Sequence, residues 1–160
     1  MSSIVITGAT GLVGSALTHI LQQDGLAPNL LARTPLTASR AESLGIEPTN
    51  FISADISKPR LGLTKTAYTK LADQTKTIYH LAARVDFKGK SLKDYQSINV
   101  DGTANIIKLA IDSGAALHFT STAFICGTSQ SYSEEQFDIG QKFHNGYEES
   151  KFLAEKAVLH

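Results

Sequence analysis

A tyrosine and a lysine stand four residues apart in the stretch YEESK, as Tyr147 and Lys151. On a helix this spacing brings both side chains to one face, where they meet across one turn. A phenol is a poor base at neutral pH, but a neighbouring ammonium group favours the phenolate form. The pair could therefore carry a proton to or from an oxygen atom of a substrate.

Three hydroxyl residues, Thr120, Ser121 and Thr122, follow one another in the stretch FTSTAFICG. A hydroxyl donor beside the same substrate oxygen would stabilise the charge that develops there during proton transfer. Taken alone, a hydroxyl cluster at the end of a strand is more often turn chemistry, and the YxxxK spacing arises by chance on many helices. Both features gain weight from the elements that surround them.

Three glycines spaced three apart, Gly8, Gly11 and Gly14, lie in TGATGLVG between a β-branched run and a helical pattern. In such a strand–turn–helix unit one glycine permits the tight turn, one lets the backbone approach a pyrophosphate, and one lets helix and strand pack closely. The free amides at the start of the helix then bind the phosphates. The pattern favours a dinucleotide site, and the alternative is a structural glycine turn without a ligand.

The residue that ends the second apolar stretch bears on the choice of cofactor. An acidic residue there, about 20 positions after the glycines, accepts hydrogen bonds from the ribose 2′-hydroxyl of NAD. This chain has Arg33 in LLARTP instead, and a guanidinium can pair with the 2′-phosphate of NADP and stack on adenine. We therefore predict NADP(H) in preference to NAD(H), with a solvated arginine as the alternative. Asp55, in SADIS, could accept a hydrogen bond from the adenine amino group or cap a turn.

These residues need a scaffold that brings them to one edge. Apolar stretches predict strands over 3–8, 29–33, 49–55, 75–83 and 116–122, and helical spacing predicts helices over 11–25, 37–45, 91–114 and from 146 or 147 onward. Residues 127–145 lack a clear period, which predicts a long loop that lines a substrate pocket. The alternation predicts a doubly wound, Rossmann-type α/β fold with a parallel sheet and helices on both faces.

The carboxyl ends of the strands are where such sheets bind ligands, and the small residues of YHLAA at 79–83 would let the backbone approach a ribose and diphosphate there. Within that stretch we expect His80 to be packed and hydrogen-bonded rather than catalytic.

The bulk composition excludes several classes of protein. A length of 160 residues predicts a single domain, and 15 basic residues balance 15 acidic ones without a basic stripe, which argues against a nucleic-acid partner. The single cysteine, Cys126, cannot form an internal disulfide, and no Cys/His ligand spacing is present, so we expect a reducing compartment and no metal site. Without an apolar run long enough to span a membrane or a signal sequence, we expect a cytoplasmic protein.

In combination and in this order, the motifs resemble the extended short-chain dehydrogenase/reductase superfamily. TGATGLVG, ADIS, YHLAA, INVDGTANIIKLA, FTSTAFICG and YEESK cover essentially the whole chain. Within the superfamily, HLAARVDF, NVDGTANI and FHNGYEESKFLAE look most like the branch of male-sterility-type fatty acyl reductases and thioester reductase domains. The resemblance implies an NADPH-dependent oxidoreductase that transfers hydride to a carbonyl or acyl thioester. Two alternatives stay open: an NAD-dependent nucleotide-sugar epimerase or dehydratase, and a non-catalytic NADP-binding module.

The resemblance also implies roles for individual residues. Tyr147 and Lys151 match the catalytic pair, Thr122 the catalytic Ser/Thr, and Asn99 the asparagine of the long helix that supports the site. Lys151 would also hold the nicotinamide ribose. The remaining cofactor contacts are expected from Gly8, Thr10, Gly11, Leu12, Val13, Gly14, Arg33, Asp55, Ile56, Leu81, Ala82 and Ala83.

One departure from the family concerns the region after the catalytic lysine. Members of the superfamily continue with further strands and a substrate-binding region, whereas this sequence ends at His160. We therefore expect either a piece of a longer enzyme or a chain that self-associates, because a parallel sheet cut after five strands exposes a face or an edge. The substrate itself, the direction and stereochemistry of the reaction and the oligomeric state do not follow from the sequence.

Overall fold

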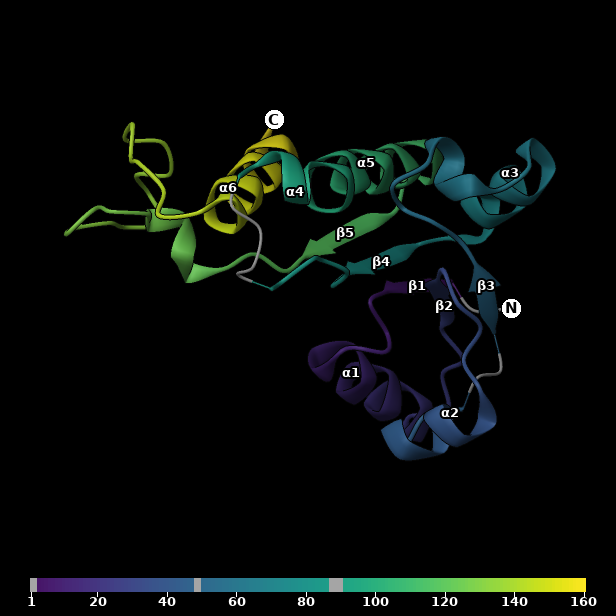
Figure 1. The fold of residues 1–160 in the computed structure, drawn as a ribbon. Coiled ribbons are helices and arrows are strands. Elements are labelled where there is room, and N and C mark those ends of the chain that lie inside the picture. Colours follow the sequence, from purple (N-terminus) through teal and green to yellow (C-terminus); the bar gives the residue numbers. More distant parts are fainter. Residues whose placement is uncertain (1–2, 48–49, 87–90) are drawn as a thin grey trace.

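The computed structural model describes residues 3–47, 50–86 and 91–160 and shows a parallel sheet of five strands in the order β3-β2-β1-β4-β5 (Figure 1). Thr49 of the third predicted strand and Phe87 of the HLAARVDF motif lie outside these residues. The strands are β1 (Ile4–Thr7), β2 (Asn29–Ala32), β3 (Phe51–Ser53), β4 (Thr77–His80) and β5 (Ala116–Phe119). All five predicted strands are present, but each is shorter than predicted.

Helices cover both faces of the sheet, which confirms the doubly wound α/β prediction (Figure 1). One face carries α1 (Leu12–Gln23) and α2 (Ala38–Leu44), and the other carries α3 (Lys65–Gln74), α5 (Asp101–Ser113) and α6 (Gly146–Leu159). This arrangement follows from right-handed crossovers. The chain leaves β3 at one edge of the sheet and crosses to β4 on the other side of β1, and from this crossover onward the helices cover the opposite face. The strand order therefore reverses beside β1, where the glycine loop begins.

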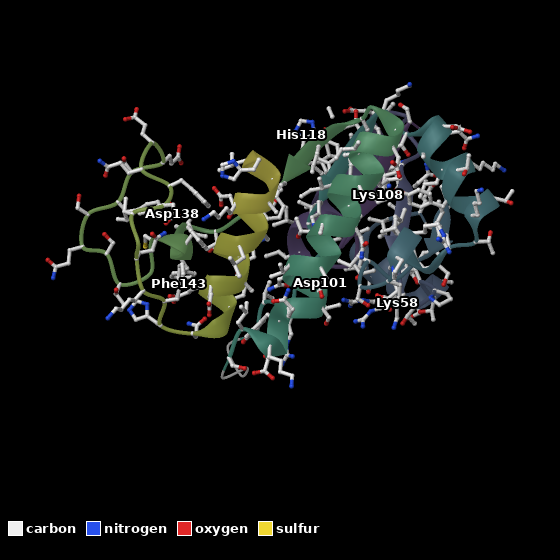
Figure 2. All side chains as sticks on the ribbon, turned by 90° about the horizontal axis from the view of Figure 1, so that it is seen from above. Lys58, Asp101, Lys108, His118, Asp138 and Phe143 are labelled. Atoms are coloured by element: carbon white, nitrogen blue, oxygen red, sulfur yellow. The ribbon has the colours of Figure 1, made fainter. Side chains whose placement is uncertain are left out.

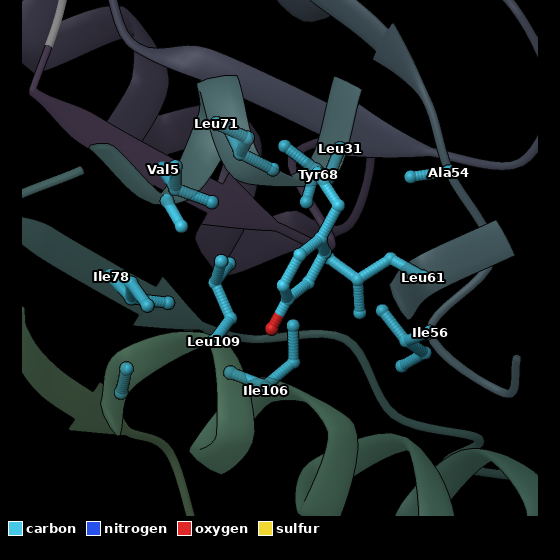
Figure 3. Close-up of a cluster of buried hydrophobic side chains, with 12 residues drawn as sticks. Val5, Leu31, Ala54, Ile56, Leu61, Tyr68, Leu71, Ile78, Ile106 and Leu109 are labelled. Atoms are coloured by element: carbon cyan, nitrogen blue, oxygen red, sulfur yellow. The ribbon is translucent and has the colours of Figure 1, made fainter. Parts of the chain in front are cut away.

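Two apolar clusters hold these layers together. The larger joins Val5, Leu31 and Ile78 of the sheet to Ile106 and Leu109 of α5 (Figure 3). The smaller packs Ile6 and Leu30 against α1 and α2. Because alternate residues of a strand point to opposite faces, Val5 and Ile6 serve different clusters.

The helix predicted over 91–114 is interrupted. It consists of α4 (Lys93–Tyr95), a π-helical turn η2 (Gln96–Val100) and α5, which ends at Gly114 in the left-handed conformation as predicted. The π-helical turn matters for the site because it carries Asn99, which is 2% exposed. An inserted residue in a helix shifts the side chains that follow, and such turns concentrate at functional sites.

The sequence prediction missed α3 and the 3-10 turn η1 (Pro59–Gly62) before it. Only Tyr68, Leu71 and Ala72 of α3 are buried, and the other seven residues are mostly polar, so the apolar period is weak. Its start is fixed by Thr64, whose side chain accepts a hydrogen bond from the amide of Ala67 at 3.2 Å. Thr64, a typical N-cap residue, was therefore the available sequence signal for the start of α3.

The segment 127–145 forms the predicted long loop, which lies beside α6 and carries Asp138 and Phe143 (Figure 2). The ring of Phe152 on α6 stacks on Phe137 at 4.8 Å between centroids. Lys156 donates to Asp138 at 2.7 Å. These contacts fix the loop against α6, although none of its residues lines the main cavity among the described residues.

Strand β5 pairs on one side with β4, and in the described part of the sheet its other edge is open. Its residues alternate between exposed and half-buried. The self-association that we expect from such an edge stays a prediction.

Candidate active site

A cavity of about 710 Å³ opens at the carboxyl edge of the sheet. The glycine loop, the ends of β2, β3, β4 and β5, and the start of α6 all contribute to its walls. Its lining includes thirteen of the residues proposed from the sequence: Gly8, Thr10, Gly11, Leu12, Val13, Gly14, Arg33, Ile56, Leu81, Ala82, Ala83, Tyr147 and Lys151. The structure therefore brings the glycine loop and the tyrosine–lysine pair to one cavity.

The three glycines of the loop have different surroundings. Gly8 has φ +75°, and a Cβ there would lie 2.7 Å from the backbone nitrogen of Ala82. A Cβ on Gly14 would overlap the carbonyl oxygen of Gly8, whereas one on Gly11 would meet that oxygen at 3.3 Å. Gly8 therefore makes the turn and Gly14 allows close packing, while Gly11 leaves space for a ligand.

The N-terminus of α1 faces the same cavity through Leu12, Val13 and Gly14. Gly11 is the N-cap, and within the described residues no side chain caps this helix. The amides of a first helical turn have no acceptor inside the helix, and the helix dipole favours negative charge at this end. The first turn of α1 thus has the features that favour binding of an anion.

The far end of the cavity is basic. Arg33 and Arg40 both line it, together with Thr34, Pro35 and Leu36. The sequence argument found Arg33 but missed Arg40, which lies in α2 and reaches the same wall from a separate element. No local sequence pattern pointed to Arg40, because its place on the wall depends on how α2 packs in the fold.

Asp55 lies between two lining residues, Ala54 and Ile56, but is not itself part of the described lining. Its Oδ1 accepts hydrogen bonds from the Ser57 amide at 3.0 Å and the Ser57 hydroxyl at 2.7 Å. These bonds, helped by the positive charge of Arg33, hold the pKa of Asp55 below its usual value. Two roles were expected for Asp55, a contact with the adenine amino group and a turn cap. The structure shows the turn cap.

The wall of the cavity beyond β3 is anchored to α5 through Ile56. Asn105 donates from Nδ2 to the Ile56 carbonyl at 2.7 Å. A Cβ on Gly102 would come within 2.9 Å of the Ile56 side chain. The motif NVDGTAN on η2 and α5 thus fixes the segment that follows β3 through its contacts with Ile56.

Tyr147 and Lys151 lie at the other end of the cavity, on α6, and are 8% and 4% exposed. The Lys151 ammonium donates to the Thr120 carbonyl at 2.7 Å and lies over the Phe119 ring, 4.2 Å from its centroid. Burial lowers the pKa of Lys151 to about 8, and the carboxylate of Glu155 opposes that shift. The Tyr147 ring meets the edge of the Tyr95 ring at 6.1 Å.

We predict that Lys151→Met raises the stability of the fold at pH 7 by about 2 kcal/mol, because a pKa lowered by burial means that the native state disfavours the charged amine. The folded-state pKa of about 8 lies below the usual lysine value of 10.5. The unfolded chain therefore binds more protons between these values, and the stability of the unsubstituted protein rises as the pH increases through this window. The gain from methionine should shrink over the same window.

Urea unfolding at several pH values measures this effect. Lys156→Met is the matched control, because Lys156 is 44% exposed and pairs with Asp138 at the surface. A methionine at 151 that destabilises the protein at pH 7 would contradict the argument.

Asn99 lies behind the site rather than in the described lining. Its Oδ1 accepts from the Arg84 amide at 2.7 Å, and its Nδ2 donates to the Arg84 carbonyl at 3.0 Å and to Ser150 Oγ at 2.9 Å. Ser150 in turn donates to the Tyr147 carbonyl at 2.7 Å. The asparagine thus connects the end of β4 to the helix that carries the tyrosine.

The three hydroxyl residues at the end of β5 lie in different surroundings. Thr120 and Ser121 line the cavity, whereas Thr122 is absent from the lining of the described residues and caps the 3-10 turn η3 (Ala123–Cys126). The Thr122 hydroxyl accepts from the Phe124 amide at 3.3 Å. Ser121 Oγ is buried and has no hydrogen-bond partner within the described part of the chain.

Two kinds of feature are absent from residues 3–47, 50–86 and 91–160. No helix there has the length and apolar character needed to cross a membrane. No three His, Cys, Asp or Glu side chains lie close enough together to hold a metal ion.

The parallel sheet, its strand order and the glycine-lined cavity define a Rossmann-type α/β domain. The model of a family of NAD-binding domains described as "male sterility protein" matches residues 6–160. The chain therefore belongs to the male sterility protein family, as its resemblance to that branch implied. Membership supports nicotinamide dinucleotide binding at the cavity.

Curated relatives are much longer than this chain. The polyketide synthase-nonribosomal peptide synthetase ffsA of Aspergillus flavipes is 32% identical in an alignment of 162 positions that covers 96% of this chain and 4% of that protein. Peramine synthetase A of Epichloe festucae is 30% identical in an alignment of 173 positions that covers 98% of this chain and 6% of that protein. The chain thus matches a small part of large synthetases.

Solved structures agree with the fold. The terminal R domain of the myxalamid PKS-NRPS biosynthetic pathway has a TM-score of 0.79 at 25% identity, over 99% of this chain and 45% of that one. A UDP-glucose-4-epimerase of Stenotrophomonas maltophila with bound NAD has a TM-score of 0.74 at 20% identity and supports the fold alone, over 99% of this chain and 48% of that one. The chain spans about half the length of both.

Proposed function

We propose that this chain is the cofactor-binding and catalytic part of an NADPH-dependent reductase that transfers hydride to the carbonyl carbon of an acyl thioester. The observation that carries the proposal is the convergence of the glycine loop with Tyr147 and Lys151 on one cavity. The similarity to parts of polyketide and nonribosomal peptide synthetases, whose names point to acyl chain assembly, favours a thioester over a sugar.

In the proposed mechanism the loop amides hold the diphosphate and the small residues Ala82 and Ala83 admit the adjoining ribose. When bound there, NADPH would supply the hydride. Tyr147 donates the proton to the carbonyl oxygen as negative charge develops there, and the nearby Lys151 ammonium stabilises the resulting phenolate. Lys151 also holds the nicotinamide ribose. Thr122, or Ser121 with its unpartnered buried hydroxyl, donates a second hydrogen bond to that oxygen.

The preference for the phosphorylated cofactor is assigned to Arg33 and Arg40. Both are exposed side chains on the same cavity wall, and two guanidinium groups can share the oxygen atoms of a 2′-phosphate. Asp55, held in its turn by Ser57, accepts from the adenine amino group through its other oxygen.

We expect Arg33→Ala and Arg40→Ala each to weaken NADPH binding about tenfold or more, because a hydrogen bond to a charged group contributes about 1.5–3 kcal/mol. Binding of NADH should change little, since NADH lacks the phosphate. Calorimetric titration with both cofactors measures the effect, and Arg60→Ala, outside the described lining, is the control. Preference of the unsubstituted chain for NADH would overturn the assignment.

The reaction itself is tested by mixing the chain with NADPH and a small acyl thioester, then following nicotinamide oxidation and the appearance of aldehyde and free thiol. Oxidation of the nicotinamide together with formation of aldehyde and free thiol supports the proposal. Tight NADPH binding without turnover of thioesters or simple carbonyls would instead favour a non-catalytic binding module. Conversion of a nucleotide sugar with NAD would favour the epimerase or dehydratase alternative.

A further inference from the structure

A buried histidine that the proposed mechanism does not use lies between β1 and α5. His80 ends β4, is 1% exposed, and is hydrogen-bonded at both ring nitrogens. Nδ1 lies 2.7 Å from Thr7 Oγ1 on β1, and Nε2 lies 3.0 Å from Thr103 Oγ1 on α5. The imidazole thus joins two strands of the sheet to a helix above it.

The direction of every bond around this ring is determined by its partners. Thr103 Oγ1 lies 2.7 Å from the Asn99 carbonyl oxygen, which can only accept, so the threonine proton is used there. Thr103 must therefore accept from His80, and Nε2 carries the hydrogen. Thr7 Oγ1 accepts from the Ala82 amide at 3.2 Å and donates its own proton to Nδ1.

These bonds form one directed chain with no unpaired member. It begins at the amide of Ala82, which lines the cavity, and ends at the carbonyl of Asn99 inside the π-helical turn. The Asn99 side chain continues it to Ser150, and Ser150 to the Tyr147 backbone. A protonated imidazole would leave the Thr7 proton without an acceptor, and burial with the nearby Lys151 charge lowers the pKa of His80 to about 3.

We propose that His80 is a positioning residue, fixed as the neutral Nε2–H tautomer, which couples the cofactor-lining end of β4 to the Asn99 turn and so sets Tyr147 relative to the bound cofactor. Its catalytic consequence rests on the proposed reductase function. The coupling itself does not, because it exists in the protein without cofactor.

Thr103→Val is the sharpest perturbation, since it removes one hydroxyl from the middle of the chain and leaves His80 and all cavity-lining residues in place. Thr75→Val is the matched control. Thr75 is also a fully buried threonine whose hydroxyl donates to a carbonyl four residues earlier, Leu71, at 2.7 Å, but it lies at the end of α3 away from the described lining.

The first measurement is NMR of the cofactor-free protein labelled uniformly with ¹³C and ¹⁵N. His80 should show the Nε2–H tautomer and remain neutral from acidic to alkaline pH within the folded range. The Asn99 side-chain amide and Tyr147 ring signals should shift in Thr103→Val and stay in place in Thr75→Val. An Nδ1–H tautomer, or signals that move equally in both variants, would overturn the proposal whatever the enzyme does.

The second measurement is single-turnover hydride transfer. Thr103→Val should lower its rate about 10- to 100-fold, the scale expected when reacting groups are slightly misplaced, with a dissociation constant for NADPH within about threefold of the unsubstituted value. A rate no lower than that of Thr75→Val would contradict the positioning role. If no variant or parent turns over any substrate, the proposed reductase function fails while the NMR result still decides the coupling.

Discussion

Tyr147→Phe is expected to lower the rate of hydride transfer about 100- to 10,000-fold, the contribution typical of a positioned general acid. NADPH binding should remain within about threefold, because Tyr147 contributes its phenol to the reacting oxygen rather than to the dinucleotide. The loss should therefore appear in kcat, with little change in the dissociation constant of the cofactor.

The substitution is well suited to the structure because phenylalanine keeps the ring. Tyr147 is 8% exposed and packs edge-on against Tyr95. The bond from Ser150 reaches the backbone carbonyl of residue 147 and does not involve the phenol. The hydroxyl is thus removed without opening a cavity, so the rate reports on proton transfer and not on folding.

Tyr132→Phe provides the control, since that phenol donates to the Phe137 carbonyl within the 127–145 loop and lies outside the described lining. Rapid-mixing measurement of nicotinamide fluorescence follows the hydride step in both variants. Full activity in Tyr147→Phe would remove the phenol from the mechanism and leave a hydroxyl such as Ser121 as the remaining candidate.

Features that depend on near neighbours in the chain were predictable from the sequence. The glycine loop is one example, because Gly8 must turn and Gly14 must pack within the same strand–turn–helix unit. The Tyr147 and Lys151 pair is another, since helical spacing alone places both on one face. For these residues the local pattern and the tertiary position agree.

Features that depend on contacts between distant segments were not predictable. Arg40 reaches the cavity only because α2 packs beside the end of β2. The π-helical turn at Asn99 is held by Arg84 and Ser150, which are 15 and 51 residues away in the chain. The sequence could not show which of the three hydroxyls lines the cavity, because that depends on the backbone beyond β5: Thr122 caps η3, and Thr120 and Ser121 lie on the lining.

Gly14→Ala is expected to abolish detectable NADPH binding, a loss of at least about 100-fold or roughly 2.7 kcal/mol. Alanine would raise the intrinsic helix propensity of α1 by about 1 kcal/mol. Its methyl group, however, would overlap the Gly8 carbonyl oxygen and lie 2.9 Å from Cα of Ala9. Overpacking of this kind costs about 1–3 kcal/mol where side chains can yield, and here the neighbours are backbone atoms.

The loop cannot easily move away from that methyl group, because Gly8 is confined on its other side. Its carbonyl accepts from the Gly11 amide at 3.0 Å, and its Cα faces the Ala82 backbone. The loop must therefore shift as a unit, which displaces the amides that bind the diphosphate. We expect the melting temperature of Gly14→Ala to fall by about 5–10 °C as well, the shift that corresponds to about 2–3 kcal/mol in a domain of this size.

Gly11→Ala separates the effect of a side chain on NADPH binding from its effect on the stability of the fold. Gly11 has φ −82° and ψ 172°, which alanine adopts freely, and its Cβ would stand 3.3 Å from the Gly8 oxygen. This variant should keep a melting temperature within about 3 °C of the unsubstituted chain, since a surface change of this kind costs about 0.5 kcal/mol. It should still lose about tenfold in NADPH affinity, because the methyl group occupies space that the phosphate needs. Calorimetric titration and thermal unfolding of both variants measure the contrast, and equal losses of stability would show that the two glycines do not divide these roles.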